Sequence, residues 1–394
     1  MAASIESPLA SEQLVVNWRD RALAWRDRCL ASPAFQRWAG RFPLTRGIAR
    51  RRAARVFDLV AGFVYSQVLA ACVRLKLFDL LAEGPRRIEA LAPRLGLDAV
   101  ATERLLAAAI ALRLVERRSA GRFGLGELGA PLVGNVAVAA MVEHHALLYA
   151  DLADPVALLR GEATSPHLAA YWPYAGATDP GAASAAQVAA YSALMSASQP
   201  LVADEVLGAV HLDAHRCLLD VGGGDGTFLV AAARRAPRLR LMVFDLPAVA
   251  TKAQLRLEAA GLGERARAVG GNFLVDALPT GADIATLIRV LHDHDDARVM
   301  TVLRAVHAAL APGGTLVVAE PMAETARAEA MGDAYFGFYL LAMGRGRPRS
   351  AQCLADLMTR SGFEAVRKVP TALPLQTQLL VGRRPLAQTL VPKT

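Results

Sequence analysis

The stretch LLDVGGGDGTFL, residues 218–229, decides the fold of this chain. Apolar residues up to Val221 predict a buried strand over residues 216–221, and the residues after the glycines predict a helix over 227–236. Glycine lets the backbone turn sharply between the two and lets a ligand approach the main chain. Because the first amides of the helix point back toward this turn, we predict a strand–turn–helix unit that binds a small molecule.

The segments that follow alternate between strand-like and helix-like patterns. Strand patterns cover residues 239–246, 282–290 and 315–320, a helix pattern covers 297–310, and a turn is expected at 311–314. This alternation predicts an α/β fold with a doubly wound parallel sheet. Such sheets bind ligands at the carboxyl ends of their strands, which is where the glycines lie.

The spacing of the glycines separates two classes of nucleotide cofactor. Dinucleotide enzymes need GxGxxG, but the third small position is Thr227 here. The sequence instead fits GxGxG over residues 222–226, directly after Asp220, and so resembles the first motif of class I methyltransferases, which bind S-adenosylmethionine. Asp245 closes the next strand, where a carboxylate can accept both ribose hydroxyls. A Rossmann-like domain that binds another nucleotide is the alternative.

Composition limits the function classes further. Of 394 residues, 54% are apolar and 20% are charged, which allows a large core and excludes wholesale disorder. The four cysteines have no CxxC spacing, so we expect a reducing compartment and no structural zinc. The N-terminus lacks the apolar run of a signal peptide. The most apolar run, residues 57–73, contains Asp58, Ser66 and Gln67, so we expect a buried helix rather than a membrane span.

The net charge of +8 is concentrated in a leader, residues 1–55. This leader holds eleven arginines and no lysine against four acidic residues, together with three of the four tryptophans. Helical spacing relates Leu14, Trp18, Ala22, Trp25 and Cys29. A basic helix with tryptophan suits a membrane interface, and a helix docked on the protein's own body or on a dimer partner is the alternative.

The sequence pattern predicts a mostly helical domain over residues 56–200 and the α/β domain over residues 201–394. Residues 77–126 are expected to form a helix, a short helix, a longer helix from Asp98 and a hairpin turning at 120–121, which is the order of a winged helix. A winged helix can read DNA. Its third helix is rich in Ala and Leu here, so we expect packing or dimerisation and no nucleic-acid partner. A DNA-binding regulator that senses S-adenosylmethionine is the rival from a different class.

Four motifs together resemble the small-molecule O-methyltransferase family. They are DVGGGDG at 220–226, VGGNF at 269–273, RVLHDHDD at 289–296 and LAPGGTLVVAE at 310–320. The resemblance implies a Rossmann-like class I methyltransferase domain and a mostly helical, winged-helix-like N-terminal dimerisation domain. It also implies a homodimer, S-adenosyl-L-methionine as the cofactor and no metal.

The same resemblance implies roles for individual residues. His292 would be the catalytic base, and Glu320 would be the acid that positions it. Substrate contacts are expected from His144, Met195, Tyr335, Phe336 and Tyr339. The cofactor-binding residues would be Asp220, Gly222, Gly223, Gly224, Gly226, Asp245, Leu246, Asn272, Phe273 and Arg289. Two positions depart from the family pattern: a second family acid would fall near Pro348, and the usual Trp of the histidine motif is His294.

The leader and its junction, residues 17–28 and 42–75, are similar to the carotenoid O-methyltransferases of purple photosynthetic bacteria. This similarity implies an apolar acceptor, the tertiary hydroxyl of an acyclic hydroxycarotenoid of the demethylspheroidene or hydroxyneurosporene type. It also implies a cytoplasmic protein, peripheral at the photosynthetic inner membrane if the leader contacts lipid. A methyltransferase acting on a bacteriochlorophyll precursor or an aromatic natural product is the alternative.

The cluster HDHDD, residues 292–296, allows other interpretations. Carboxylates and imidazoles bind metals, but consecutive residues cannot all converge on one ion. His292 can also be purely structural, and the acidic pair before the expected helix is explained by capping. We favour a general base, because imidazole accepts a proton near neutral pH.

Overall fold

The computed structural model describes residues 17–163, 166–171, 185–375 and 377–386. Leu14 of the leader pattern therefore lies outside the described residues. The chain divides into two compact units. The first unit contains residues up to 75 together with 85–126, and the second contains 76–84 together with everything from 127 onward.

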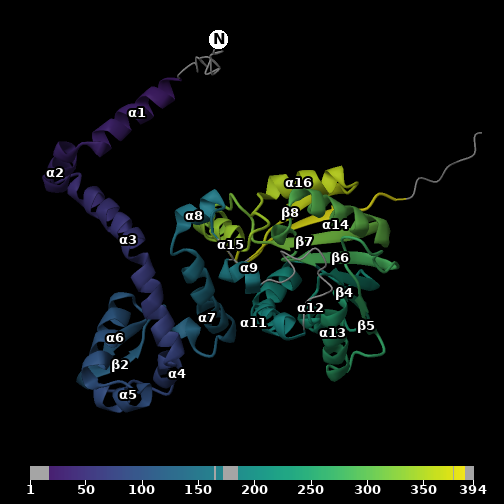
Figure 1. Cartoon of the computed structure of the whole chain (residues 1–394), viewed down its shortest axis with the longest axis horizontal. Coiled ribbons are helices and arrows are strands. Elements are labelled where there is room, and N and C mark those ends of the chain that lie inside the picture. The colour runs from purple at the N-terminus through teal and green to yellow at the C-terminus, as the bar shows by residue number, and fades with distance from the viewer. Residues whose placement is uncertain (1–16, 164–165, 172–184, 376, 387–394) are drawn as a thin grey trace, which may run out of the picture. The chain divides into compact units, whose positions relative to one another are not determined.

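The first unit consists of helices and one hairpin (Figure 1). Ser32 separates the first two helices, because its hydroxyl accepts the Phe35 N–H at 3.4 Å and Pro33 has no N–H to donate to a preceding turn. Asp98 caps the last helix by accepting the Ala101 N–H at 2.7 Å. The elements are α1 (Trp18–Ala31), α2 (Pro33–Arg41), α3 (Arg46–Arg74), α5 (Ile88–Leu95), α6 (Ala99–Ala111), β1 (Val115–Arg118) and β2 (Arg122–Leu125). With α4 (Leu77–Ala82) before α5, the expected order of helices and hairpin is confirmed.

Residues 57–73 were predicted to form a helix that is buried, and the prediction is wrong about the burial. The run is helical, within α3, but Phe57, Leu59 and Phe63 are 61%, 84% and 68% exposed. Only Ala70 and Cys72 of this helix are buried. Among the described residues, α3 is also the one helix long and apolar enough to cross a membrane. Length and composition do not separate a membrane span from a helix covered by another protein surface, so neither the burial nor its partner could be predicted from the pattern.

The second unit holds a seven-stranded sheet with the order β5-β4-β3-β6-β7-β9-β8. The strands β3 to β7 run parallel, and β9 pairs antiparallel with β7 and with β8. The strand order reverses between β3 and β6, and such a switch point opens a ligand crevice at the carboxyl ends. The strands are β3 (Cys217–Val221), β4 (Arg240–Asp245), β5 (Ala266–Gly270), β6 (Ala282–Ile288), β7 (Leu310–Glu320), β8 (Glu364–Val369) and β9 (Gln378–Arg383). The doubly wound α/β fold is thereby confirmed, but the expectation of a parallel sheet is wrong at β9, which runs antiparallel to both of its neighbours and makes the sheet mixed.

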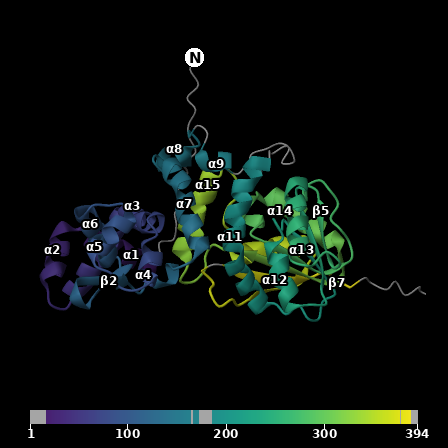
Figure 2. The same cartoon turned by 90° about the horizontal axis from the view of Figure 1, so that it is seen from below.

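Helices cover both faces of this sheet (Figure 1). On one face α14 (Asp296–Ala309) and α16 (Ala351–Arg360) bury Val299, Leu303 and Leu357 against the strands. On the other face, toward the viewer in Figure 2, α12 (Thr227–Arg235) and α13 (Pro247–Ala259) bury Phe228 and Leu257. The strands are apolar on both sides because both sides are covered.

The expected turn at 311–314 is wrong. These residues belong to β7, which starts at Leu310 and pairs with β6 through a register shift between Ala282 and Ile284. A shift of this kind absorbs extra residues inside a strand, and Gly313 adopts the positive φ of +77° that it requires. The Pro-Gly-Gly sequence therefore marks an irregular strand rather than its end.

A helical layer lies beside the sheet in the second unit (Figure 1). It comprises α7 (Val136–Asp151), α8 (Pro155–Arg160), α9 (His167–Tyr171), α11 (Ala185–Ala209) and α15 (Phe336–Ala342). Leu148, Leu158, Leu168 and Leu340 form its apolar core. This layer brings residues from both ends of the unit to the edge of the sheet where the glycine loop lies.

Candidate active site

The glycine loop between β3 and α12 has a backbone that other residues could not adopt. Gly222, Gly224 and Gly226 have φ values of +69°, +59° and +80°. At Gly223 the constraint is space, because a Cβ there would lie 2.4 Å from Oδ2 of Asp220. The glycines therefore allow the loop to fold tightly over Asp220 and leave its outer backbone open to a ligand.

Asp220 lies beneath this loop and is only 1% exposed. The Thr286 hydroxyl donates to its Oδ1 at 2.6 Å, while Oδ2 has no hydrogen-bond partner among the described residues. Burial raises the pKa of Asp220 to about 7, and the nearby charge of Asp245 adds to this. The structure thus places Asp220 as a buried support of the loop.

Asp245 stands at the end of β4 and is half-buried. Its carboxylate accepts the Gly224 N–H at 2.8 Å and the Leu246 N–H at 2.7 Å, so it ties the glycine loop to the start of α13. Burial raises its pKa to about 6, against the effect of these two hydrogen bonds. Its remaining lone pairs can accept hydroxyl protons from a ribose at the switch point.

Asn272 and Phe273 lie in the turn after β5. Asn272 organises this turn itself: its Oδ1 accepts the Leu274 N–H at 3.0 Å, and its N–H donates to Asp276 at 2.8 Å. Phe273 is half-buried, and its ring lies close to the space a Cβ on Gly222 would occupy. An apolar ring therefore flanks the glycine loop, as an adenine site requires.

Arg289 follows β6 with a φ of +56°, which is unusual for a residue with a side chain. Its guanidinium donates to the Ser198 hydroxyl at 2.7 Å, to the Met195 carbonyl at 3.2 Å and to Gln199. Arg289 thereby fastens α11 to the carboxyl edge of the sheet, in addition to any contact it makes with a cofactor.

The residues at this edge fit S-adenosylmethionine. The open backbone of the loop, the half-buried Asp245 and the apolar Phe273 provide separate surfaces for the methionine part, the ribose and the base. One more group at this edge is not indicated by any pattern in the sequence. The Asp225 carboxylate accepts from Ser196 at 2.6 Å and from Arg256 at 2.7 Å, so α11 and α13 meet at the glycine loop.

His292 lies just beyond β6, with its side chain 11% exposed. Its Nδ1 bonds to Oε2 of Glu320, and the other oxygen of Glu320 accepts the N–H groups of Val290 and Leu291 at 2.9 and 2.7 Å. Glu320 is therefore held by backbone amides and in turn holds the imidazole. The arrangement keeps a proton on Nδ1 and leaves Nε2 as the ring nitrogen that can accept one.

Asp293 is a neighbour of His292 that the sequence analysis did not assign. Its Oδ1 lies 3.1 Å from Nε2 of His292, without hydrogen-bond geometry. Burial alone would lower the pKa of His292, but the charges of Asp293 and Glu320 outweigh it and raise that pKa to about 9. Asp293 is the second carboxylate beside the imidazole in this chain.

The segment 345–350, where the second family acid was expected, holds the histidine loop through its backbone and an arginine. Arg347 donates its N–H to the His292 carbonyl at 3.0 Å, and a Cβ on Gly346 would collide with that same carbonyl. The buried Arg349 donates to the carbonyls of Leu291 and His294 at 2.9 and 2.7 Å. The missing acid is thus replaced by a cation that binds the main chain on both sides of His292.

Aromatic side chains gather next to His292. A π-helical turn, Ala330–Tyr335, leads into α15, so that Tyr335, Phe336 and Tyr339 present their rings to α7 and to the imidazole. The Phe336 ring centroid is 6.0 Å from that of His292. The Tyr339 hydroxyl bonds to His144 at 2.8 Å, and the half-buried Met195 packs against the same cluster. All five expected substrate residues therefore lie in one apolar cluster.

His145 belongs to this cluster as well, through a hydrogen bond of 2.7 Å to the Tyr335 hydroxyl. Burial lowers the pKa of His144 to about 4 and lowers that of His145, so both imidazoles are neutral near pH 7. In the described parts of the chain, no three His, Cys, Asp or Glu side chains converge as a metal site would require.

Comparison with known proteins agrees with this geometry. A model of the O-methyltransferase domain matches residues 149–364, and a model of the O-methyltransferase dimerisation domain matches residues 57–135. The chain therefore belongs to the O-methyltransferase family, as an enzyme dependent on S-adenosylmethionine.

Individual relatives within this family are similar over most of the chain. The chain is 46% identical over 362 residues to demethylspheroidene O-methyltransferase of Cereibacter sphaeroides, covering 91% of this chain and 94% of that protein. It is 41% identical to the protein of the same name from Rhodobacter capsulatus, covering 87% of this chain and 85% of that protein. Among solved structures, the calicheamicin-biosynthesis methyltransferase CalO1 in its SAH-bound form matches with a TM-score of 0.71 at 26% identity, over 85% of this chain and 98% of that one.

Proposed function

We propose that this enzyme methylates the tertiary hydroxyl of an acyclic hydroxycarotenoid of the demethylspheroidene or hydroxyneurosporene type. The observation that carries the proposal is the 46% identity, over nearly the whole length of both chains, to a demethylspheroidene O-methyltransferase. The apolar cluster of Phe336, Tyr339 and Met195 beside His292 supports it, because an extended hydrocarbon needs such a lining.

Different groups of residues would have different roles in this reaction. Bound S-adenosylmethionine supplies a methyl group on a sulfonium, which an oxygen can take by in-line displacement. The glycine loop and Asp245 would hold the cofactor, and the aromatic cluster would orient the acceptor, since alignment alone lowers the barrier substantially. As the new carbon–oxygen bond forms, the hydroxyl proton passes to Nε2 of His292, and Glu320 offsets the charge that the imidazole gains.

The timing of the proton transfer follows from the acceptor. A tertiary alcohol is far too weak an acid to ionise before attack, so its proton leaves with or after bond formation. His292 must then be neutral at the start, although Asp293 and Glu320 favour its charged form. A positive charge nearby lowers the pKa of a histidine, so a bound sulfonium would favour the neutral form of His292.

The assembly and location belong to the same proposal. The match to the dimerisation domain supports a homodimer, and the exposed apolar face of α3 supports a partner there. A carotenoid acceptor dissolves in lipid, so the enzyme would work as a cytoplasmic protein at the photosynthetic inner membrane, reached through residues 1–55.

One reaction tests the function. Purified enzyme with S-adenosylmethionine and a 1-hydroxylated acyclic carotenoid in detergent micelles should give the methoxy product, identified by a mass gain of one methylene. A phenolic polyketide under the same conditions serves as the control acceptor. Turnover of the phenol with none of the carotenoid would overturn the substrate assignment.

A further inference from the structure

We propose that the aromatic face of α2, formed by Phe35, Trp38 and Phe42, docks the enzyme on an anionic lipid surface. This inference rests on the proposed function, because it gives the enzyme access to an acceptor dissolved in lipid.

The aromatic face is continuous. The ring centroids of Phe35 and Trp38 are 5.6 Å apart, and those of Trp38 and Phe42 are 5.0 Å apart and stacked. Trp38 remains 51% exposed and Phe42 38% exposed, and the neighbouring Leu44 is 81% exposed. Stacked aromatic rings with exposed edges are the side chains that settle at the headgroup level of a bilayer.

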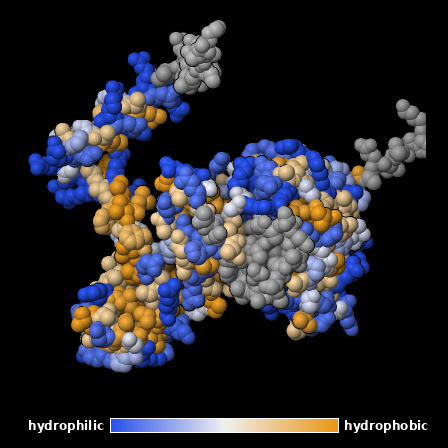
Figure 3. Space-filling model, in the orientation of Figure 1, coloured by the Kyte–Doolittle hydropathy of each residue, from blue (hydrophilic) through white to orange (hydrophobic). Residues whose placement is uncertain are grey.

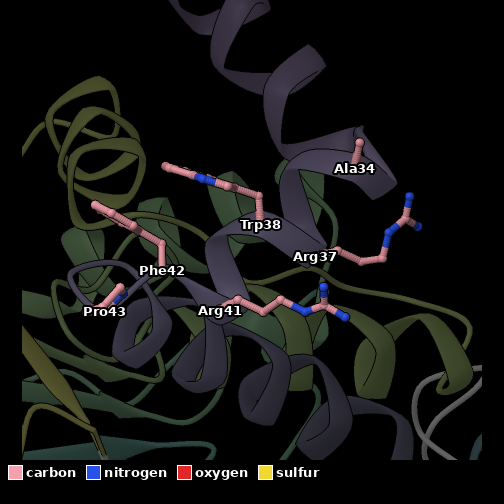
Figure 4. A pocket seen from close by; sticks show the side chains of 6 residues that line it. All are labelled: Ala34, Arg37, Trp38, Arg41, Phe42 and Pro43. Carbon is pink, nitrogen blue, oxygen red and sulfur yellow. The ribbon is translucent and has the colours of Figure 1, made fainter.

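Arginines flank this face in the same helix. Arg37 and Arg41, one helical turn apart, extend in Figure 4 to the other side of the helix from the Trp38 and Phe42 rings. All four side chains, together with Ala34 and Pro43, line an open hollow of about 540 Å³. Because each arginine precedes a ring by one residue and adjacent helical residues are rotated by about 100°, the two guanidiniums border the aromatic face on one side. Guanidiniums bind phosphate oxygens by paired hydrogen bonds while aromatic rings enter the acyl boundary.

The charge of the whole leader has the sign that anionic lipid requires. Residues 17–55 contain eleven arginines and only two acidic residues, Asp20 and Asp27. Asp27 is already paired with Arg26, at 2.7 Å. The blue surface of α1 and α2 in Figure 3 shows this concentration of polar side chains around the apolar ones. Such a segment is attracted to a negative membrane surface over about one Debye length.

Two other occupants are less well matched to this face. The match to the family dimerisation domain begins at residue 57, after α2, so it gives no reason to place Phe35, Trp38 or Phe42 in a chain–chain interface. Nucleic acid would also attract arginines, but it gives no reason for exposed rings on α2 and at its end, with the exposed Leu44 two residues further on. A lipid surface uses both the charge and the apolar area.

Vesicle co-sedimentation of the full-length enzyme tests the proposal. Large vesicles of phosphatidylcholine, with and without phosphatidylglycerol, are the probes. The enzyme should bind the anionic vesicles and be released by salt. The W38A/F42A variant should lose roughly tenfold or more of its partition coefficient, and R37Q/R41Q about 30-fold on anionic vesicles only. The conservative R37K/R41K variant should keep most of the binding.

Matched controls lie in the second unit. L255A/V275A removes two exposed apolar side chains, and R234Q/R235Q removes two exposed arginines. Both should bind vesicles like the unaltered enzyme. Equal binding by W38A/F42A, or loss of its native oligomeric state in light scattering, would overturn the proposal, the latter in favour of a chain–chain interface. Binding of duplex DNA instead of vesicles at the same salt concentration would also overturn it.

A second readout separates this inference from the function itself. W38A/F42A should methylate carotenoid in detergent micelles at the unaltered rate and carotenoid embedded in anionic vesicles more slowly. If the unaltered enzyme turns over no carotenoid even in detergent, the proposed function fails, while the vesicle-binding result still decides the docking surface.

Discussion

Charged side chains occupy opposite environments in two regions of this molecule. At the carboxyl edge of the sheet, Asp220 and Glu320 are each 1% exposed, and Arg349 is 3% exposed. In α1 and α2 the arginines stay in solvent among exposed rings such as Trp18 at 75% and Trp25 at 65%. We refer to these regions as the polar edge and the leader helices.

The difference shows what each region depends on. A buried charge is costly unless partners at fixed positions meet it, so the polar edge depends on contacts between residues far apart in the chain. Exposed charge needs no partner, so the leader helices depend on composition and helical spacing. Single substitutions should therefore have large effects in the first region and small ones in the second.

The largest effect is expected for His292. H292A removes the group that accepts the proton and should lower kcat by about 10²- to 10⁴-fold. Calorimetric titration should show that the cofactor still binds, because no described contact of His292 reaches the glycine loop. H211A, at an exposed histidine, is the control. An unchanged rate in H292A would refute the base assignment.

Arg349 tests whether the polar edge positions the base through its main chain. R349M removes the donors to the Leu291 and His294 carbonyls and should lower kcat by about 10- to 100-fold, with KM for the cofactor little changed. R349K should recover only part of the rate, since one ammonium cannot reach both carbonyls. The pH profile must shift as well. A lower rate with an unaltered profile and a lowered melting temperature would indicate a merely structural role.

A matched pair of glycine substitutions compares the two regions directly. G223A places a Cβ 2.4 Å from Asp220 and 2.7 Å from Val243, and should destabilise the fold by about 1–3 kcal/mol and weaken cofactor binding. G47A, in α3, meets no atom of the described residues within 4 Å and should raise stability by less than about 1 kcal/mol. Urea unfolding measures both changes. The same sign for both would contradict the contrast between the regions.

The smallest effect is a shift in pH dependence. The charge of Asp293 helps to raise the pKa of His292 to about 9, so kcat/KM of the free enzyme should rise with pH toward that value. D293N removes the charge and should move this rise to lower pH. The raised pKa also means that His292 stabilises the fold below about pH 6.5 and loses this contribution as pH passes about 9. An unshifted profile in D293N would show that Glu320 alone controls the imidazole.

Much of the polar edge could be predicted from the sequence. The strand–turn–helix around residues 218–229 is found with ends within one residue of those expected. His292 and Glu320 were paired through family motifs, and the structure places their side chains in contact. These predictions succeed because a glycine loop needs a particular backbone conformation, and the glycines that allow it are close together in the sequence.

Other contacts at the same edge could not be predicted. No local pattern connects Arg349 with Leu291, or Asp225 with Ser196 and Arg256, since each contact depends on how helices pack over the sheet. The burial of residues 57–73 was predicted wrongly for a related reason. An apolar helix pattern predicts that the helix is covered, but it does not indicate whether the same chain or another surface covers it.

The sequence by itself thus determined the cofactor class, the reaction type and the basic, tryptophan-rich character of the leader, because each is carried by neighbouring residues. Only the tertiary structure decided that Asp220 supports the glycine loop from below, that Asp293 and Arg349 frame His292, and that Trp38 and Phe42 stack on an exposed face. Those outcomes depend on which side chains the folded chain brings together and which it leaves in water. Burial matters because two charges interact more strongly in the protein interior than in water.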